Sequence, residues 1–157
     1  MESTSGHPVR VENAAPRGVA AVRARLPISD VSARFPEYLD QVYAAGRAGS
    51  VGLDGQNVFI YGGAAGPDGA TEMDFGVGAL GPFAPVGSVR YAALPAGEVA
   101  ATTHWGDYAG LGAAHGAVIA WCRAHGRELA GPRWEVYGHW SDDPARRRTD
   151  VYHLLSA

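Results

Sequence analysis

The sequence contains an internal repeat, and a duplicated unit constrains the fold more than any single motif does. The matching segments, in chain order, are residues 14–18 (AAPRG) with 93–97 (ALPAG), 59–62 (FIYG) with 135–138 (EVYG), and 71–73 (TEM) with 149–151 (TDV). The offsets between them are 79, 76 and 78 positions. Nearly constant offsets in the same order indicate that the chain is built from two copies of one structural unit.

Each half has the pattern of two strands, a helix and two further strands. A Pro-x-Gly turn separates the first two strands, and glycines 46 and 126 are placed to end the helices. In the first half the expected strands are 9–13, 19–25, 57–61 and 71–77, and the helix lies between 28 and 46, with Pro36 beginning its regular part. In the second half the strands are 88–92, 99–104, 133–139 and 150–154, and the helix is 109–124. These elements predict an α+β fold with tandem β-α-β-β units forming one antiparallel sheet.

Length and composition fit a single globular domain. The chain has 157 residues, 46% of them hydrophobic and 18% charged, and we expect a mobile tail at 1–7 before one domain at 8–157, with repeats at 8–80 and 86–156 joined by a proline-containing linker. The net charge of −3 gives no basic surface for direct nucleic-acid binding. The N-terminus does not have the pattern of a signal peptide, no apolar run reaches membrane-spanning length, and Cys122 is the single cysteine. We therefore predict a soluble, cytoplasmic protein.

Two motif-like patterns do not indicate a cofactor or a metal. Residues 76–81 (GVGALG) match G-x-G-x-x-G, but the following 82–85 (PFAP) cannot form the helix whose N-terminus would bind a pyrophosphate. The six histidines show no spacing that presents two imidazoles together. We expect no cofactor and no metal ion.

The segment 134–140 (WEVYGHW) is the most informative in the chain. Side chains alternate along a strand, so Glu135 and Tyr137 share one face while Trp134 and Val136 share the other. We expect the apolar face to pack on the helices and the Glu135 face to form a cleft on the opposite side of the sheet. In the repeat, the corresponding positions are Asn57, Phe59 and Tyr61.

Such a face would combine aromatic rings with one carboxylate, which is a receptor for a flat organic cation. The alternative is that Glu135 is solvated on an outer strand face and that the aromatic residues belong to an ordinary core.

The chain resembles the GyrI-like small-molecule-binding family, most clearly in its second half. The motifs that carry the resemblance are residues 103–108 (THWGDY), Trp121 with Gly126, 134–137 (WEVY), 143–144 (DP) and 149–152 (TDVY), and the resemblance covers residues 8–155. It implies two paired β-α-β-β units with helices on one side and a ligand cleft on the other. It places Glu135, Tyr137, Tyr152 and Tyr108 in the ligand site. Trp105, Trp140 and His139 stand at variable positions and are expected to make the cleft more aromatic, while Tyr38, Phe59 and Tyr61 are added from the repeat alone.

Three functions follow from this resemblance. The first is the binding of small aromatic drug-like molecules, cationic ones included, for sensing or sequestration, as in the effector domains of multidrug-sensing regulators and in xenobiotic or antibiotic resistance. Because no helix-turn-helix precedes the domain, we expect it not to be a complete regulator. The second is a hydrolase that opens the cyclopropane of DNA-alkylating natural products, with Glu135 as base and Tyr152 or Tyr137 polarising the substrate carbonyl. The third is binding to a partner protein such as gyrase, which the family name implies.

Overall fold

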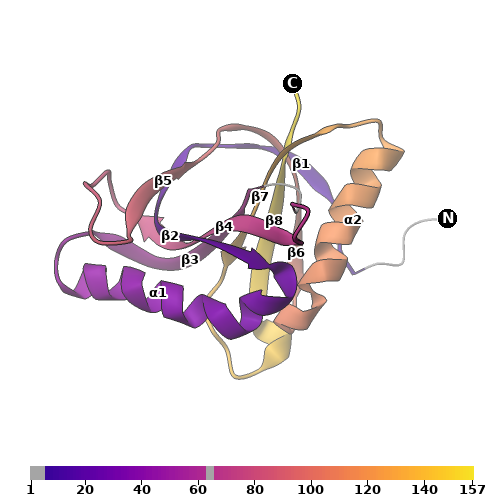
Figure 1. The fold of residues 1–157 in the computed structure, drawn as a ribbon. Coiled ribbons are helices and arrows are strands. Elements are labelled where there is room, and N and C mark those ends of the chain that lie inside the picture. The colour runs from indigo at the N-terminus through magenta and orange to yellow at the C-terminus, as the bar shows by residue number, and fades with distance from the viewer. Residues whose placement is uncertain (1–5, 63–65) are drawn as a thin grey trace.

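The computed structural model describes residues 6–62 and 66–157, which form eight strands, two α-helices and three short 3-10 turns (Figure 1). In the first half these are β1 (Arg10–Ala14), β2 (Arg17–Pro27), α1 (Val31–Arg47), β3 (Leu53–Tyr61) and β4 (Ala70–Ala79). In the second half they are β5 (Arg90–Leu94), β6 (Gly97–Trp105), α2 (Leu111–Ala124), β7 (Leu129–Tyr137) and β8 (Arg148–Leu155). The turns are Ile28–Asp30, Tyr108–Gly110 and Pro144–Arg146. The predicted α+β class and the order of elements in each unit are confirmed.

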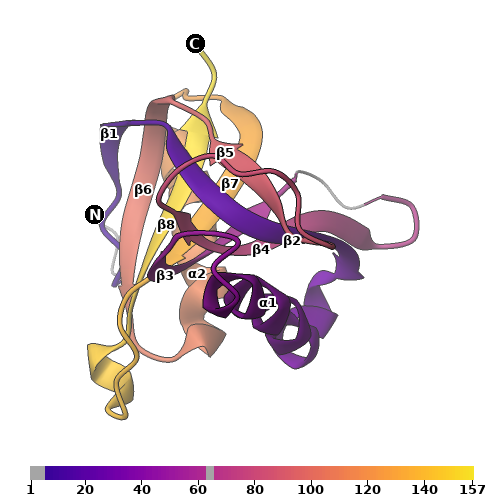
Figure 2. The ribbon, with the colours of Figure 1, turned by 90° about the vertical axis from the view of Figure 1, so that its left-hand side faces the viewer.

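All the strands belong to one curled antiparallel sheet, in the order β1-β6-β8-β7-β3-β4-β2-β5 (Figure 2). Each strand of the first half has its counterpart at the mirrored place in this order, so β3 and β7 meet at the centre. The first strand of each half is exchanged, since β1 pairs with β6 and β5 pairs with β2. The sheet is therefore pseudo-symmetric about the β3–β7 pair.

Strand pairing defines the number of positions between equivalent residues of the two halves more accurately than the sequence matches do. Arg10 of β1 pairs with Ala101, and Arg90, its counterpart in β5, pairs with Ala21. Each residue of these strands is therefore 80 positions from its counterpart in the other half (90 − 10 and 101 − 21). In the strands that follow the helices, counterparts are 76 positions apart. Phe59 pairs with Phe75, and their counterparts Glu135 and Val151 pair in the same way.

Glycines with positive φ occupy one equivalent place in the two halves. Gly55 (φ 84°) and Gly131 (φ 116°) are 76 positions apart, and each lies at a register shift in its strand. Glycine adopts this backbone conformation with little strain, and such irregularities bend a strand. The two central strands are therefore irregular at matching positions.

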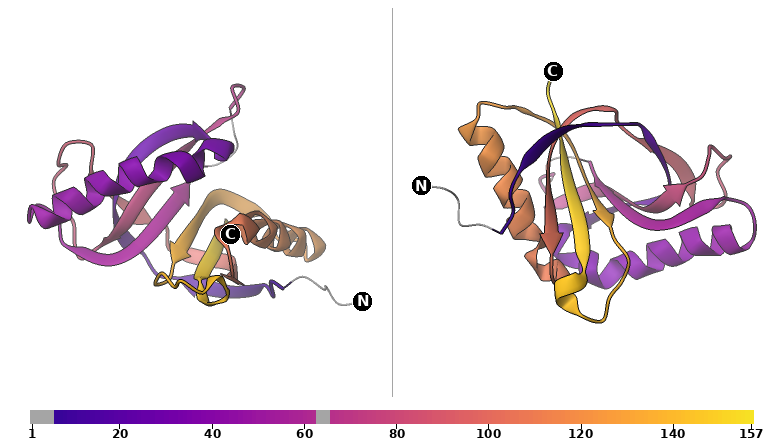
Figure 3. Two further views of the ribbon diagram at one scale, coloured as in Figure 1. Left: turned by 90° about the horizontal axis from the view of Figure 1, so that it is seen from below. Right: turned by 180° about the vertical axis from the view of Figure 1, so that it is seen from behind.

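The helices pack on one face of the sheet, each over its own half (Figure 3). Buried residues of α1, including Leu39 and Val42, pack with Val22 and Phe75, while Val118 and Cys122 of α2 pack with Ala100. The opposite face has a core of its own around Val19, Val99, Trp134 and Val136. The curled sheet thus buries apolar side chains on both faces.

Two local expectations, those for Pro36 and Gly46, need correction. Pro36 lies inside α1, which already begins at Val31 after a 3-10 turn. Gly46 also lies within α1, whereas Gly126 follows α2 with φ 65°, as expected of a residue that ends a helix. Residues 1–5 of the expected mobile tail are outside the described residues, but His7 is anchored, since its Nε2 lies 2.9 Å from His104 Nδ1. In the part of the chain that the structure describes, no helix is long and apolar enough to cross a membrane.

Candidate functional site

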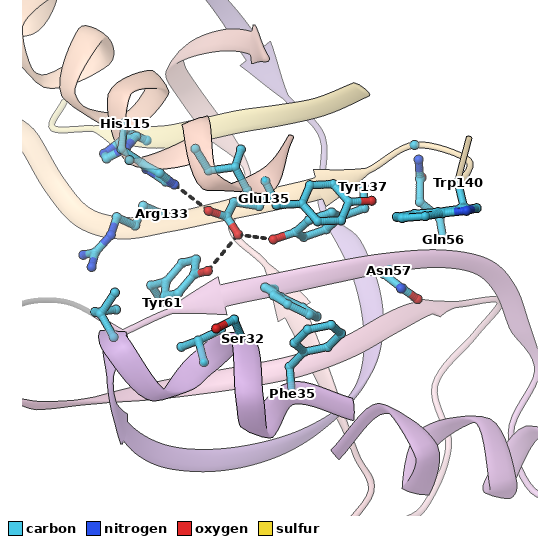
Figure 4. Close-up of a pocket in the computed structure, with 18 of the residues that line it drawn as sticks. Ser32, Phe35, Gln56, Asn57, Tyr61, His115, Arg133, Glu135, Tyr137 and Trp140 are labelled. Carbon is cyan, nitrogen blue, oxygen red and sulfur yellow. Dashed lines mark hydrogen bonds and ion pairs between the residues drawn. The ribbon is translucent and has the colours of Figure 1, made fainter. Parts of the chain in front are cut away.

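A large cleft lies between the two helices, over the central strands β3 and β7, and has a volume of about 1460 Å³ (Figure 4). Typical small-molecule sites measure about 300 to 1,000 Å³, so this cleft has room for a ligand of several rings. Ile28, Ser32 and Phe35 line it from the first helical segment, and Leu111 and His115 line it from the second.

The expectation that the cleft and the helices occupy opposite faces is therefore wrong. Strand alternation correctly separates Glu135 and Tyr137 from Trp134 and Val136, but Trp134 and Val136 pack in the core on the far side. The reason is that both faces of the curled sheet are covered. An apolar face is then no sign of which side holds the helices.

Glu135 is at the centre of the site, where its carboxylate is buried, with 3% of the residue exposed. The hydroxyls of Tyr61 and Tyr137 both donate to its Oε1, at 2.7 and 2.6 Å. Its Oε2 lies 2.7 Å from Nε2 of His115 (Figure 4). A buried carboxylate requires such partners, and hydrogen bonds to charged groups are among the stronger ones in proteins.

Burial changes the pKa values of the two tyrosines that donate to this carboxylate. Desolvation, followed by the nearby negative charge of Glu135, raises the pKa of both Tyr61 and Tyr137 well above the usual phenol value. Both phenols therefore stay protonated and can only donate to the carboxylate at neutral pH. Arg133 also lines the cleft, with its guanidinium carbon 5.3 Å from the centre of the Tyr61 ring.

His115 connects Glu135 to a second histidine. Its Nδ1 lies 2.8 Å from Nε2 of His153, so Glu135, His115 and His153 form a continuous hydrogen-bonded chain from β7 through α2 to β8. Burial lowers the pKa of His153 to about 3, with further lowering by His115 and Arg133. His153 is therefore neutral at physiological pH.

In the other half of the repeat, aromatic side chains replace this polar pair. Phe35 is the counterpart of His115, 80 positions away, and Phe59 is the counterpart of Glu135, 76 positions away. The ring centroids of Phe35 and Phe59 are 5.5 Å apart, whereas His115 and Glu135 are joined by a hydrogen bond. Equivalent positions of the two halves therefore carry a polar pair, His115 and Glu135, in one half and an aromatic pair, Phe35 and Phe59, in the other.

Aromatic rings continue from the floor of the cleft to its rim. Successive ring centroids are 4.9 Å apart for Phe59 and Tyr137, 5.4 Å for Tyr137 and Tyr108, and 6.2 Å for Tyr108 and Trp140. Trp140 is 62% exposed, yet the Arg147 guanidinium lies 3.8 Å from its ring centre and holds it from one side. We call Phe35, Phe59, Tyr137, Tyr108 and Trp140 the aromatic wall.

Most of the residues predicted for the site line the cleft, namely Glu135, Tyr137, Tyr108, Trp140, His139, Phe59 and Tyr61. Three others do not, which corrects the sequence-based assignment. Tyr152 points to the far face, where it stacks on Trp134 at 5.7 Å, because it alternates with His153 along β8. Tyr38 packs on Phe75 in the core beneath α1. Trp105 lies at the exposed end of β6 beside Arg148.

Sequence reasoning missed His115, His153, Arg133 and Phe35 as cleft residues. His115 and Phe35 belong to helices, and neither has a motif around it that indicates a site. The available signal was the repeat itself, since it aligns a histidine with a phenylalanine beside the same apolar stripe. Among residues 6–62 and 66–157 there is no group of three or more histidine, cysteine or acidic side chains arranged to hold a metal ion.

Comparison with known structures shows the same fold in proteins of low sequence identity. The C-terminal domain of EcmrR matches with a TM-score of 0.80 and 16% identity, covering 97% of this chain and 99% of that one. In an EcmrR–DNA complex the match covers 96% of this chain but 57% of the EcmrR chain.

Two further structures match over most of their length. SAV2435 bound to tetraphenylphosphonium matches with a TM-score of 0.65 and 8% identity, covering 96% of this chain and 94% of that one. A hydrolase from Listeria innocua matches with a TM-score of 0.56 and 10% identity, covering 94% and 91%.

No match was found among curated proteins. The model of the GyrI-like small molecule binding domain, however, matches residues 7–155, which is nearly the whole chain and includes both repeats and the cleft between them. The protein therefore belongs to the GyrI-like family of small-molecule-binding domains.

Proposed function

We propose that the cleft binds aromatic cations reversibly, with the positive charge near Glu135 and the rings along the aromatic wall. The observation that carries this proposal is the burial of the hydrogen-bonded carboxylate of Glu135 in a large cleft rich in aromatic side chains. We assign the ligand contacts to Glu135, Tyr137, Tyr61, Phe59, Tyr108, His139 and Trp140.

The state of the carboxylate favours a particular kind of cation. An ionised carboxylate has about four acceptor positions, and three are already used by Tyr61, Tyr137 and His115. A primary ammonium would need several new acceptors, whereas a quaternary or delocalised cation needs only proximity to the charge. At about 4 Å and an effective dielectric constant of about 20, that attraction is about 4 kcal/mol before desolvation is subtracted. The site is therefore suited to cations without strong hydrogen-bond donors.

The aromatic wall supports broad recognition of such ligands. Stacking on aromatic rings tolerates many ring shapes, and a single charge gives little directional discrimination. These properties suit a protein that senses or sequesters many drug-like compounds and so contributes to resistance. The structural likeness to SAV2435 bound to tetraphenylphosphonium and to the EcmrR C-terminal domain supports this role.

Two ions of almost the same shape and opposite charge provide the test. Tetraphenylphosphonium and tetraphenylborate present the same four phenyl rings, so the main difference that a binding site can detect is their charge. Isothermal titration calorimetry should show the phosphonium binding at least about tenfold more tightly. Equal affinities, or tighter binding of the borate, would contradict the proposal.

A second candidate function is the hydrolytic opening of a strained cyclopropane. The observation that favours it is the hydrogen bond from His115, which gives Glu135 the orienting partner that a general base requires. In such a reaction Glu135 takes a proton from water, the water oxygen bonds to a ring carbon, and the ring carbon–carbon bond breaks towards a conjugated carbonyl. Tyr137 or Tyr61 can donate to that carbonyl oxygen, whereas Tyr152 lies on the wrong face.

Mass spectrometry distinguishes this candidate from simple binding. The protein is incubated with a cyclopropane-bearing alkylator, and the molecular mass of the recovered small molecule is measured. A gain of one water that depends on active protein supports the hydrolase. Recovery of the unchanged compound supports binding alone.

A further inference from the structure

The hydrogen-bonded chain of Glu135, His115 and His153 gives the site more than one possible charge. His115 is placed between the carboxylate at 2.7 Å and His153 at 2.8 Å. The other groups that face it are Arg133, which lines the same part of the cleft, and Tyr61, whose ring centroid is 6.1 Å from that of His115. His115 is thus an ionisable group in direct contact with the proposed ligand anchor.

The hydrogen bonds of His115 can form in two protonation states with the same positions of the heavy atoms. When His115 is neutral, its Nε2–H donates to Glu135 and its Nδ1 accepts from Nε2–H of His153. When His115 is protonated, both of its nitrogens donate, and Nε2 of neutral His153 accepts. Imidazole has a donor or an acceptor available for each arrangement. One proton can therefore enter or leave without breaking the chain.

The additional proton has one imidazole on which to reside. Burial lowers the pKa of His153 to about 3, so the additional proton resides on His115. With ionised Glu135, protonated His115 makes the pair neutral overall, and neutral His115 leaves it with a charge of −1. The net charge of the ligand anchor thus follows the protonation of His115.

We infer that His115 determines the charge preference of the cleft, admitting cations when it is neutral and uncharged ligands when it is protonated. This inference rests on the proposed function, because it assumes that Glu135 is the anchor for cations. By thermodynamic linkage, a cation that favours the deprotonated state expels the proton on binding. The affinity for such a cation then falls by up to about tenfold for each pH unit of acidification over the range in which His115 is protonated.

The experiment measures proton release and affinity together. Tetraphenylphosphonium, whose charge does not change with pH, is titrated by calorimetry at about pH 5 to 8, the range in which histidine changes charge. Each titration is repeated in two buffers that differ in ionisation enthalpy. We expect weaker binding at acid pH and release approaching one proton per cation there.

Two variants identify the titrating group. His115→Gln keeps a donor towards Glu135 but carries no titratable proton, so its affinity for tetraphenylphosphonium should be nearly constant with pH and higher than that of the wild type at the acid end. His125→Gln is the matched control, because His125 is exposed and stacks on Trp121 outside the cleft. It should retain the pH dependence of the wild type.

The possible outcomes separate this inference from the proposed function. Binding that is equally tight from pH 5 to 8 without proton release would overturn the role of His115 and leave cation binding intact. A pH dependence that persists in His115→Gln would assign the proton to another titratable group of the cleft, Glu135 or His139, and would also overturn it. Absence of binding at every pH would overturn the proposed function and this inference with it. If His115→Gln does not fold, proton release by the wild type still decides whether binding is coupled to a proton.

Discussion

Phe59 and Glu135 are paired directly across the two central strands and are also each other's counterparts in the internal repeat. The axis of pseudo-symmetry therefore passes between an apolar ring and a buried carboxylate. Tyr61 and Tyr137 are likewise counterparts, and both hydroxyls donate to the same oxygen of Glu135. A pseudo-symmetric scaffold thus carries a buried carboxylate on one side of its axis only, which is an arrangement suited to a ligand with one charged centre and several rings.

The two phenols should contribute measurably to stability through Glu135. Replacing Tyr61 or Tyr137 by phenylalanine removes one hydrogen bond to a buried charge, and we expect each change to lower the free energy of unfolding by about 1.5 to 3 kcal/mol. Urea denaturation provides the measurement. Tyr38→Phe is the control, since its hydroxyl interacts with Arg34 at the surface. Equal, small effects in all three variants would show that the carboxylate does not depend on the phenols.

The exposed tryptophans allow a test of where ligands bind. Trp140 and Trp105 are similarly exposed, at 62% and 58%, and each lies beside an arginine, but Trp140 lines the cleft and Trp105 does not. We expect Trp140→Ala to weaken tetraphenylphosphonium binding by about 3- to 30-fold through loss of cation–π and stacking contacts. Trp105→Ala should leave the dissociation constant unchanged. A larger effect of Trp105→Ala would locate the ligand elsewhere.

Burial of neutral His153 should make folding sensitive to acid. Its pKa is lowered from 6.5 to about 3 in the folded protein, so between these values the unfolded chain binds a proton that the folded chain does not. Stability from this residue is present above about pH 6.5 and is lost as the pH falls towards 3. The expected slope is up to about 1.4 kcal/mol per pH unit.

Denaturation curves for the wild type and His153→Gln between about pH 7 and 4.5 measure this slope. The variant should lose less stability per pH unit than the wild type, while His125→Gln should behave like the wild type. Parallel curves for wild type and His153→Gln would mean that His153 titrates in the folded protein as it does in the unfolded chain.

The repeat made much of the architecture predictable. Strand alternation placed Glu135 with Tyr137 and, through the repeat, with Phe59 and Tyr61, and all four line the cleft. This succeeded because side-chain alternation depends on local backbone geometry alone. Tyr152 was assigned by the family resemblance and not by alternation, and it lies on the far face because it alternates with His153 along β8.

The side of the sheet that holds the cleft was not predictable from the same reasoning. It depends on the exchange of β1 and β5 between the halves and on the curl that gives the far face its own core. Nor could the partners of Glu135 be read from their spacing, since His115 comes from a helix and His153 from the next strand along the sheet. Such long-range contacts are determined by how elements pack, and a lone histidine carries no signal of them.

The most direct test of the central claim is the affinity of Glu135→Gln for tetraphenylphosphonium, measured by calorimetry beside the wild type. Glutamine keeps the size of the side chain but removes the charge, and the variant should bind the cation about ten- to a hundredfold more weakly. Glu72→Gln is the control, because Glu72 is an exposed carboxylate outside the cleft and should not affect binding. Affinities within about twofold of the wild type for a folded Glu135→Gln would contradict the claim that this carboxylate is the anchor for cations.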